Sequence, residues 1–311
     1  MTKPDDSSLD PDERRAVEER ARRLLDRASA WGVFPTPIND IVAAARLKVA
    51  PTSIFDLEGI AAFLKNKAAD TANNLKSALS KIFGIYDSDE SVIHIDDSVG
   101  ETKQNFLKLH ETGHHELPTH RKIFKFFQDC NQTLAPDVAD QFEREANNFA
   151  RFAMFQGDGY ADQARDLPLE IKSPMRLAKD FGASQYASAR EFARTNHRAC
   201  VVYVLEPVEF AQGDGFRAQV RRIEPSPSFR SQFGKPTCTT ITPGHFLGKI
   251  IPIGRRMSRP TTVALTDLNG QRHEAIAEAF DTKRNILILL YPKAALSKIN
   301  IILPAGFKAS A

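Results

Sequence analysis

Apolar and polar positions alternate with two different periods along the chain, one helical and one of strand type. Between residues 137 and 155 the apolar positions recur at i, i+4, i+7 and i+11 from Phe142, which predicts an amphipathic helix. Further helices are expected at residues 12–29, 36–47, 56–68, 71–81, 173–182 and 184–195, and one from about Glu101 to the proline at 118.

Strand-type alternation predicts two separate sheets. Residues 48–54 should form a short strand, and residues 81–96 a hairpin around an acidic turn. After about residue 197 the expected elements are strands, at residues 199–208, 215–224, 261–269, 273–281 and 285–292. A tight turn is expected at Asn269 and Gly270, because these residues tolerate the positive φ angles of hairpin turns.

These elements predict an α+β fold with two domains. A disordered N-terminus at 1–12 precedes a mainly helical domain with a small β-sheet at 13–196. A sheet-rich α/β domain follows at 197–311. The length of 311 residues is sufficient for two domains that each bury a core.

Composition narrows the class of protein further. The chain has no run of 18 or more apolar residues that could cross a membrane, and residues 1–15 are too polar for a signal peptide. The three cysteines are far apart, which fits a reducing compartment better than a disulfide framework. These features predict a cytoplasmic protein with no membrane partner.

The net charge of +3 conceals a difference between the two parts of the chain. Residues 1–196 carry 26 Lys and Arg against 31 Asp and Glu, whereas residues 197–311 carry 16 against 8. The basic excess of the C-terminal part favours an anionic partner. An ordinary basic surface explains it equally well.

The segment NFLKLHETGHHELPTH at residues 105–120 combines a helical apolar rhythm with an H-E-x-x-H pattern. His110 and His114 lie four residues apart on one helix face, so both imidazoles can reach one metal ion. Glu111 could then accept a proton from a metal-activated water, as the general base of peptide hydrolysis does. Gly113 costs helix stability, which suggests that another segment approaches closely there. The alternative is a histidine-rich helix that matches a short pattern by chance.

The helix at 137–155 supplies a third ligand. Glu143 follows His114 by 29 residues, and two histidines with one glutamate and an open fourth position are typical of catalytic zinc. Asn147 lies one turn further on the same face, where it could hydrogen-bond a ligand. Glu145 is interpreted as solvated. The alternative for Glu143 is a surface carboxylate on an amphipathic helix.

Together the two segments resemble the ImmA/IrrE family of metallopeptidases. The family patterns F-x-x-x-H-E-x-G-H and E-x-x-A-N-x-F-A match residues 106–114 and 143–150. The downstream stretch at 177–192 is similar to the family's F-G-V-S helix pair, and the resemblance covers roughly residues 35–196. Thr112 departs from the family pattern, which has a bulky apolar residue there.

The resemblance implies a zincin-like peptidase domain with one Zn²⁺ per chain, for which Mn²⁺ is an alternative. It implies His110, His114 and Glu143 as the metal ligands and Glu111 as the general base. It also implies a substrate, a helix-turn-helix repressor that is encoded nearby. Cleavage of this repressor would release genes of mobile elements, the DNA damage response or phage defence.

Other residues have weaker assignments. Cys130, between the two ligand helices, could bind the metal and inhibit the enzyme, or be a small buried residue. His115 and His120 are interpreted as structural or solvated rather than as ligands. Tyr186 and His197 are candidate oxyanion donors.

The helix pair at 175–194 also has the outline of a DNA-binding helix-turn-helix, with Gln185, Tyr186 and Arg190 toward the groove. The acidic charge of this part of the chain argues against that function. A DNA-binding transcription regulator is therefore one alternative to the peptidase. A second alternative is a metal-binding regulator that sequesters its repressor partner without cutting it.

The C-terminal domain has no catalytic motif, and its strand pattern and position are similar to those of a GAF-like sensor. Single-stranded DNA or a small anionic ligand could bind it and activate the peptidase. The candidate binding residues are Arg217, Arg221, Arg222, Arg255, Arg256 and Arg259. Phe216, Phe229, Phe233 and Phe246 interleave with basic residues and could stack on bases, although phenylalanines in strands are usually core.

Overall fold

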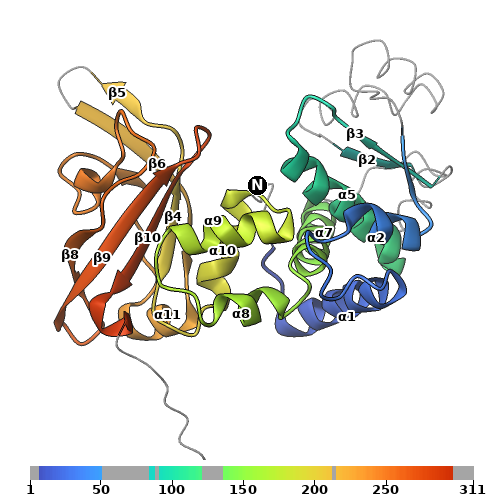
Figure 1. The fold of residues 1–311 in the computed structure, drawn as a ribbon, viewed down its shortest axis with the longest axis horizontal. Coiled ribbons are helices and arrows are strands. Elements are labelled where there is room, and N and C mark those ends of the chain that lie inside the picture. Colours follow the sequence, from blue (N-terminus) through green and yellow to red (C-terminus); the bar gives the residue numbers. More distant parts are fainter. Residues whose placement is uncertain (1–6, 51–83, 88–90, 121–135, 212–214, 297–311) are drawn as a thin grey trace, which may run out of the picture. The chain divides into compact units, whose positions relative to one another are not determined.

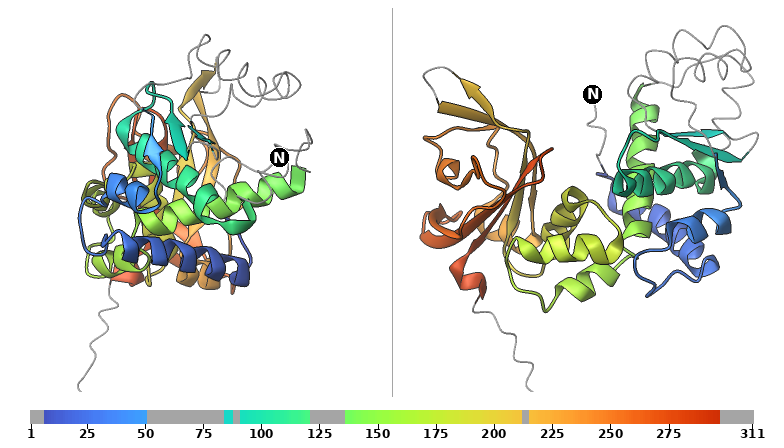
Figure 2. Two further views of the ribbon diagram at one scale, coloured as in Figure 1. Left: turned by 90° about the vertical axis from the view of Figure 1, so that its right-hand side faces the viewer. Right: turned by 45° about the horizontal axis from the view of Figure 1, so that its top comes forward.

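The computed structural model describes residues 7–50, 84–87, 91–120, 136–211 and 215–296. Contacts divide the chain into two compact units. The first unit comprises residues 1–160 and 179–184, and the second comprises residues 161–178 and 185–311. Figures 1 and 2 show helices around a small sheet in the first unit and a large curled sheet in the second. Within the described ranges, no helix is both long and apolar enough to cross a membrane.

The first unit is built on α1 (Pro11–Arg27), α2 (Ile38–Ala44), α5 (Glu101–Glu116) and α7 (Pro136–Met154). α1 begins inside the segment expected to be disordered, because Asp10 and Glu13 form a capping box at its start. The Asp10 side chain accepts hydrogen bonds from the backbone of Asp12 and Glu13, and the Glu13 side chain accepts one from the backbone of Asp10. These bonds satisfy amide groups that a helix start leaves unpaired.

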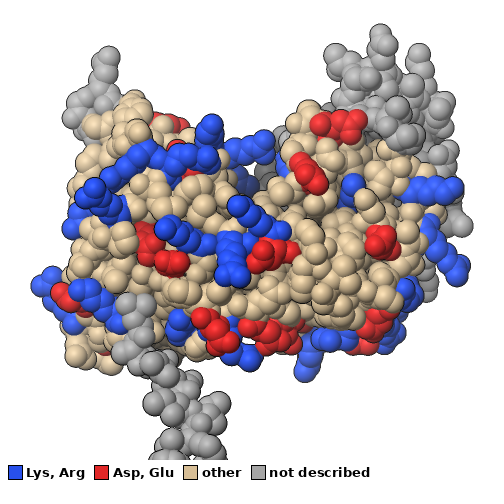
Figure 3. All heavy atoms as spheres, viewed as in Figure 1, with Lys and Arg blue, Asp and Glu red and all other residues tan. Residues whose placement is uncertain are grey.

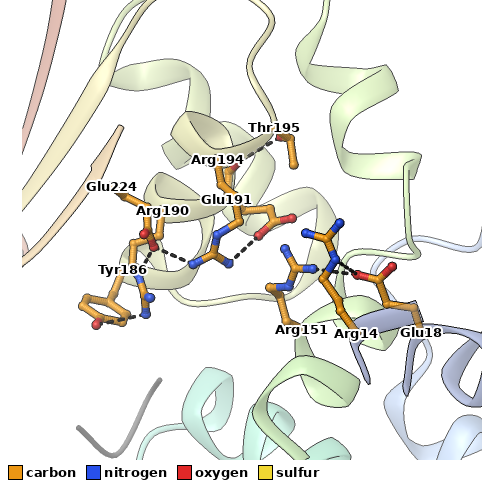
Figure 4. A network of polar contacts seen from close by, with 9 residues as sticks. All are labelled: Arg14, Glu18, Arg151, Tyr186, Arg190, Glu191, Arg194, Thr195 and Glu224. Atoms are coloured by element: carbon orange, nitrogen blue, oxygen red, sulfur yellow. Dashed lines mark hydrogen bonds and ion pairs between the residues drawn. The ribbon is translucent and has the colours of Figure 1, made fainter. Parts of the chain in front are cut away.

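The predicted apolar stripe of α7 is confirmed. Phe142, Ala146, Phe149 and Ala153 are all buried, and α7 packs on both α5 and α1. Polar side chains support the contact with α1, since Arg151 forms an ion pair with Glu18 at 3.0 Å (Figure 4). The helix that carries Glu143 is therefore held from two sides.

The small sheet of the first unit contains β1 (Lys48–Val49), β2 (Gly84–Asp87) and β3 (Val92–Ile95) in the order β1-β3-β2. β2 and β3 pair antiparallel, which confirms the predicted hairpin, and β1 adds to β3 in parallel. β2 and β3 both contact α5. The helices predicted at 56–68 and 71–81 lie outside the described residues.

The second unit contains a seven-stranded antiparallel sheet. The strand order is β5-β6-β4-β10-β9-β8, and β7 pairs with β6. The strands are β4 (Val201–Leu205), β5 (Glu209–Ala211), β6 (Gly215–Pro225), β7 (Thr240–Ile241), β8 (Thr261–Thr266), β9 (Arg272–Asp281) and β10 (Ile286–Pro292). All five strands predicted for this region are confirmed, including the β8–β9 turn, where Gly270 has a φ of +81°. β5, β7 and the short helix α11 (Pro227–Phe233) were not predicted.

Alternate residues of the sheet form the core of the second unit. β4 and β10 are buried along their whole length, as expected for the central strands of a covered sheet. Their side chains meet Phe229 of α11 and the short 3₁₀ helix η1 (Gly248–Ile250) on one face. A further 3₁₀ helix, η2 (Lys293–Leu296), follows β10.

The helices α8 (Gly159–Ala164), α9 (Lys172–Phe181) and α10 (Gln185–Thr195) lie mostly in the second unit, although the expected boundary was near 197. α10 packs on β4 and β6. Glu224 of β6 accepts hydrogen bonds from Arg190 and Arg194 of α10 (Figure 4).

A buried carboxylate also holds the segment before α9 to the sheet. Glu278 of β9 accepts hydrogen bonds from the Ile171 amide at 3.2 Å and from the Tyr291 hydroxyl at 2.8 Å. Sequence periodicity does not reveal such contacts between distant segments. The domain boundary near residue 197 stays a prediction.

We expect the Glu224 network to make the stability of the protein depend on pH. Burial raises the pKa of Glu224, but Arg194 and Arg190 outweigh it, so the pKa lies below its ordinary value of 4.5. The ionised carboxylate therefore stabilises the fold above pH 4.5, and this contribution is lost as the pH falls through the lowered pKa. Glu224→Gln should cost about 1–3 kcal/mol in urea unfolding at neutral pH and progressively less in acid.

Glu206→Gln is the matched control, because Glu206 pairs with Arg221 at 3.4 Å while both side chains remain more than one third exposed. Its effect should be below about 1 kcal/mol at any pH. A loss for Glu224→Gln that stays constant into acid would contradict the assigned charge state.

Candidate metal centre

Two histidines on α5 and one glutamate on α7 converge at one point of the first unit. The Nε2 atoms of His110 and His114 lie 3.2 Å apart. The Glu143 carboxylate lies 3.2 Å from His110 Nε2 and 3.5 Å from His114 Nε2. Among the described residues this is the group of His, Cys, Asp and Glu that could hold a metal ion.

The distances fit a tetrahedral ion. Two ligand atoms that each lie about 2.0–2.1 Å from zinc are roughly 3.3 Å apart at the tetrahedral angle. The three separations between ligand atoms range from 3.2 to 3.5 Å, so the ligands need little movement to share one ion. Both histidines are buried, whereas the Glu143 side chain is 54% exposed. Two imidazoles and one carboxylate therefore fit catalytic zinc.

The protonation states also suit a cation. Burial lowers the pKa of His114 to about 4, so its ring is neutral at physiological pH and can donate a lone pair. Burial raises the pKa of Glu143, but the hydrogen bonds with His110 and His114 outweigh it and hold the carboxyl ionised. Burial alone would lower the pKa of His110, but the carboxylates of Glu143 and Glu111 outweigh this effect. The net result is a pKa above the ordinary value of 6.5. The site thus attracts positive charge.

Glu111 is buried beside the first ligand, at 7% exposure. A carboxylate at this depth is expensive unless a positive charge faces it, and a metal ion between the two histidines would supply that charge. Asn147 is also buried, one turn after Glu143, and its side chain contributes to raising the pKa of His110. Its supporting role stays a prediction.

Close packing of α5 on α7 brings the ligands together. A Cβ added at Gly113 would lie 3.2 Å from three atoms of the buried Phe149 side chain, so the expected close approach at this glycine is confirmed. The neighbouring Thr112 is fully buried, and its hydroxyl donates to the Lys108 carbonyl oxygen at 2.7 Å. This bond explains how a hydroxyl occupies a position where the family pattern has an apolar residue.

One interpretation from the sequence is wrong. Glu145 is not solvated, because it accepts a hydrogen bond from His120 at 2.8 Å and its side chain is 15% exposed. His120 itself is fully buried, and its Nδ1 atom lies 3.0 Å from Nδ1 of His114. Neither residue belongs to the ligand group.

Three further candidates lie elsewhere. Cys130 is outside the described residues. Tyr186 lies in the second unit, where its hydroxyl accepts a hydrogen bond from Arg190 at 3.2 Å. His197 lines a cavity of about 710 Å³ in the same unit, together with Arg198 and Ser228. The oxyanion role of Tyr186 and His197 stays a prediction.

The proposed DNA-reading face of α10 is engaged within the second unit. Arg190 is 11% exposed, and its Nε atom donates to Glu224 at 2.9 Å. Its guanidinium also lies over the Tyr186 ring. Two of the three residues assigned to DNA contact are therefore part of the packing between α10 and the sheet.

Basic side chains are prominent on the second unit in the view of Figure 3. Arg217, Arg255, Arg256 and Arg259 are exposed, whereas Arg221 pairs with Glu206 and Arg222 is half-buried. Phe216 and Phe229 belong to the core, and Phe233 packs on Phe229 with ring centroids 4.8 Å apart. Phe246 remains exposed. Most of the interleaved aromatic residues are thus core residues.

Comparisons with known proteins agree with this geometry. The Peptidase M78 family model, described as an IrrE N-terminal-like domain, matches residues 71–191. This segment therefore belongs to the ImmA/IrrE family. All three ligand candidates lie in the matched segment, and the family indicates a metallopeptidase that would hold a metal ion there. A search of curated proteins gave no match.

The fold of the chain also resembles a solved structure, a transcriptional regulator of Mycobacterium tuberculosis, with a TM-score of 0.51. The two sequences are 12% identical, and the alignment covers 89% of this chain and 75% of that one. At this identity the likeness concerns the fold alone.

We expect Gly113→Ala to weaken both the fold and the metal site. Alanine stabilises a helix by about 1 kcal/mol relative to glycine, but overpacking against a buried side chain costs about 1–3 kcal/mol. Phe149 is fully buried and packed in the core, so we expect the cost of overpacking to exceed the gain in helix propensity and the net effect to be destabilising. Thermal unfolding measures this change, and zinc titration should show weaker binding as α5 and α7 move apart.

Gly100→Ala is the control, because it changes the N-cap residue of the same helix and its added Cβ would meet nothing within 4 Å. It should leave zinc affinity unchanged. If Gly113→Ala bound zinc as tightly as the wild type, close packing at this position would not determine the ligand geometry.

Proposed function

We propose that this protein is a zinc-dependent endopeptidase that cuts a helix-turn-helix transcriptional repressor at one site. The observation that carries the proposal is the buried Glu111 beside a three-ligand cluster that leaves one tetrahedral position open. A structural zinc site would use its fourth position for a further protein ligand, and it would need no base. The match of residues 71–191 to the ImmA/IrrE family supports the same reaction class.

In this proposal His110, His114 and Glu143 hold the metal. A zinc ion held by these residues would supply Lewis acidity, which can lower the pKa of water to about 7 and polarise a carbonyl group. Glu111 accepts the proton that the attacking water loses and passes it to the amine of the departing peptide. Burial protects this carboxylate from bulk water, which strengthens its interaction with the transferred proton.

The proposed substrate is a transcription regulator. The resemblance of the peptidase segment to ImmA/IrrE proteins supports a helix-turn-helix repressor, and the similar fold in a protein described as a transcriptional regulator is compatible with this role. Cleavage would separate the DNA-binding part of the repressor from the remainder and release the genes that it controls. Stress, mobile-element and phage-defence genes are the proposed targets.

The second unit is the proposed sensor, of GAF-like or related type. Its exposed arginines and the basic excess after residue 197 support a regulatory role, and its described part contains no group of His, Cys, Asp and Glu residues that could hold a metal ion. Single-stranded DNA is the proposed activator, because phosphates can meet Arg255 and Arg259 in an exposed loop. The limited number of exposed aromatic residues favours contact through charge over base stacking.

The decisive variant is Glu111→Gln. It preserves the shape of the side chain but removes the base, so zinc binding should remain within a few-fold of wild type while repressor cleavage falls by at least about 10²-fold. The assay is a gel of the repressor encoded nearest to this gene, incubated with zinc-loaded full-length protein with and without single-stranded DNA. His115→Ala, a change on the same helix outside the ligand group, is the control.

The result separates three functions. A discrete cut by wild type and by His115→Ala, but not by Glu111→Gln, supports the peptidase. Equal binding of an uncut repressor by all variants would instead support a metal-containing regulator that sequesters its partner. Loss of specific DNA binding in Arg190→Ala, with no cleavage by any protein, would favour the transcription regulator.

The sensor proposal predicts salt-dependent binding. Substituting both Arg255 and Arg259 by Ala should weaken binding of a labelled oligothymidylate in fluorescence anisotropy and reduce the salt slope by about one for each lost phosphate contact. The control removes two exposed arginines from α1, Arg15 and Arg23, which changes the net charge equally. Equal losses for both double variants would mean that only overall charge matters and would contradict a specific sensor surface.

A further inference from the structure

His120 is a buried histidine that the proposed reaction does not use. It is fully buried between α5 and α7, with its ring stacked on Phe142 at a centroid distance of 4.0 Å. One ring nitrogen, Nδ1, lies 3.0 Å from Nδ1 of the ligand His114. The other, Nε2, lies 2.8 Å from the Glu145 carboxylate. Both nitrogens of a buried ring are thus satisfied by side chains.

The direction of these hydrogen bonds follows from the metal ligand. When Nε2 of His114 faces an ion, its proton resides on Nδ1 and must be donated outward. Nδ1 of His120 is the atom within reach, so it accepts, and the His120 proton then resides on Nε2. That proton is donated to Glu145, which is an acceptor when ionised. The two hydrogen bonds are therefore compatible. The tautomer of His114 that leaves Nε2 free for a metal pairs with the tautomer of His120 that donates to Glu145.

We infer that His120 and Glu145 are positioning residues for the metal centre, which act through the ring of His114. Hydrogen bonding to Nδ1 fixes the ring plane and the tautomer of a ligating histidine, and it increases the basicity of Nε2. Here the support comes through an inserted histidine, so the charge of Glu145 reaches the ligand through two hydrogen bonds in series. The inference rests on the proposed metal site but not on peptide cleavage.

Glu145 is itself held in place. Its second oxygen accepts a hydrogen bond from the Gln141 side chain at 3.1 Å, and the same amide nitrogen donates to Glu13 of α1 at 3.0 Å. The side-chain amide of Gln141 thus donates one hydrogen to Glu145 and the other to Glu13, which belongs to the capping box of α1.

Packing alone is the competing explanation for His120, because its ring contacts Phe142. The variant His120→Phe separates the two explanations, since phenylalanine can stack on Phe142 but forms neither hydrogen bond. His120→Asn is the complementary variant, because its side-chain oxygen can replace Nδ1 as the acceptor for His114. Glu145→Ala removes the outer acceptor. His115→Ala again serves as the control.

Zinc affinity of the full-length apoprotein, measured by competition with a chromogenic chelator, is the main readout. We expect His120→Phe to lose about 10–100-fold in affinity, His120→Asn to recover at least part of that loss, and His115→Ala to stay at wild-type affinity. The absorption spectrum of the cobalt-substituted protein should change in His120→Phe as the ligand ring reorients. Circular dichroism of each apoprotein shows which variants are folded.

The double variant His120→Phe with Glu145→Ala decides whether the residues act in series. If they do, the loss in the double variant should equal that of His120→Phe alone. Wild-type affinity in folded His120→Phe, or fully additive losses, would overturn the inference, and so would a wild-type protein that binds no zinc. A zinc-binding protein that cleaves no repressor would contradict the proposed function and leave this inference intact.

Discussion

The close contact between Gly113 and Phe149 is the constraint on which the metal centre depends. His110 and His114 belong to one helix and Glu143 to another, so the distance between α5 and α7 determines whether three ligands can meet. At Gly113 a single added carbon would already crowd the Phe149 ring. The energy for this approach comes from the apolar stripe of α7, whose burial also draws Glu143 toward the histidines.

The ligand set could be predicted from the sequence because it follows helix periodicity. His110 and His114 are separated by one turn, and Glu143 lies beside an apolar stripe that must face the core. The link between His120 and Glu145 was not expected from the sequence, because Glu145 was interpreted as solvated although this residue also lies beside the stripe. At 100° per residue, Glu143 lies about 100° to one side of Phe142, and Glu145 lies about 60° to the other. Both flank the buried face.

Other differences between expectation and structure arise from contacts that have no periodic signal. The strands β5 and β7 are too short to show alternation. α10 was assigned to the peptidase domain from its helical pattern, but two arginines on it pair with one glutamate on β6. Such ion pairs join residues about thirty positions apart and depend on which surfaces meet. Periodicity therefore identified the elements better than their assembly into units.

The two carboxylates on opposite flanks of α7 have a mechanical consequence. A rotation of α7 about its own axis that brought Glu143 nearer to the histidine pair would carry Glu145 away from His120, and the reverse rotation would do the opposite. Because Glu143 contacts His110 and Glu145 contacts His120, α7 has one preferred rotation about its own axis relative to α5. These polar contacts therefore fix the rotation of α7 about its axis, which the burial of its apolar stripe alone would allow to vary.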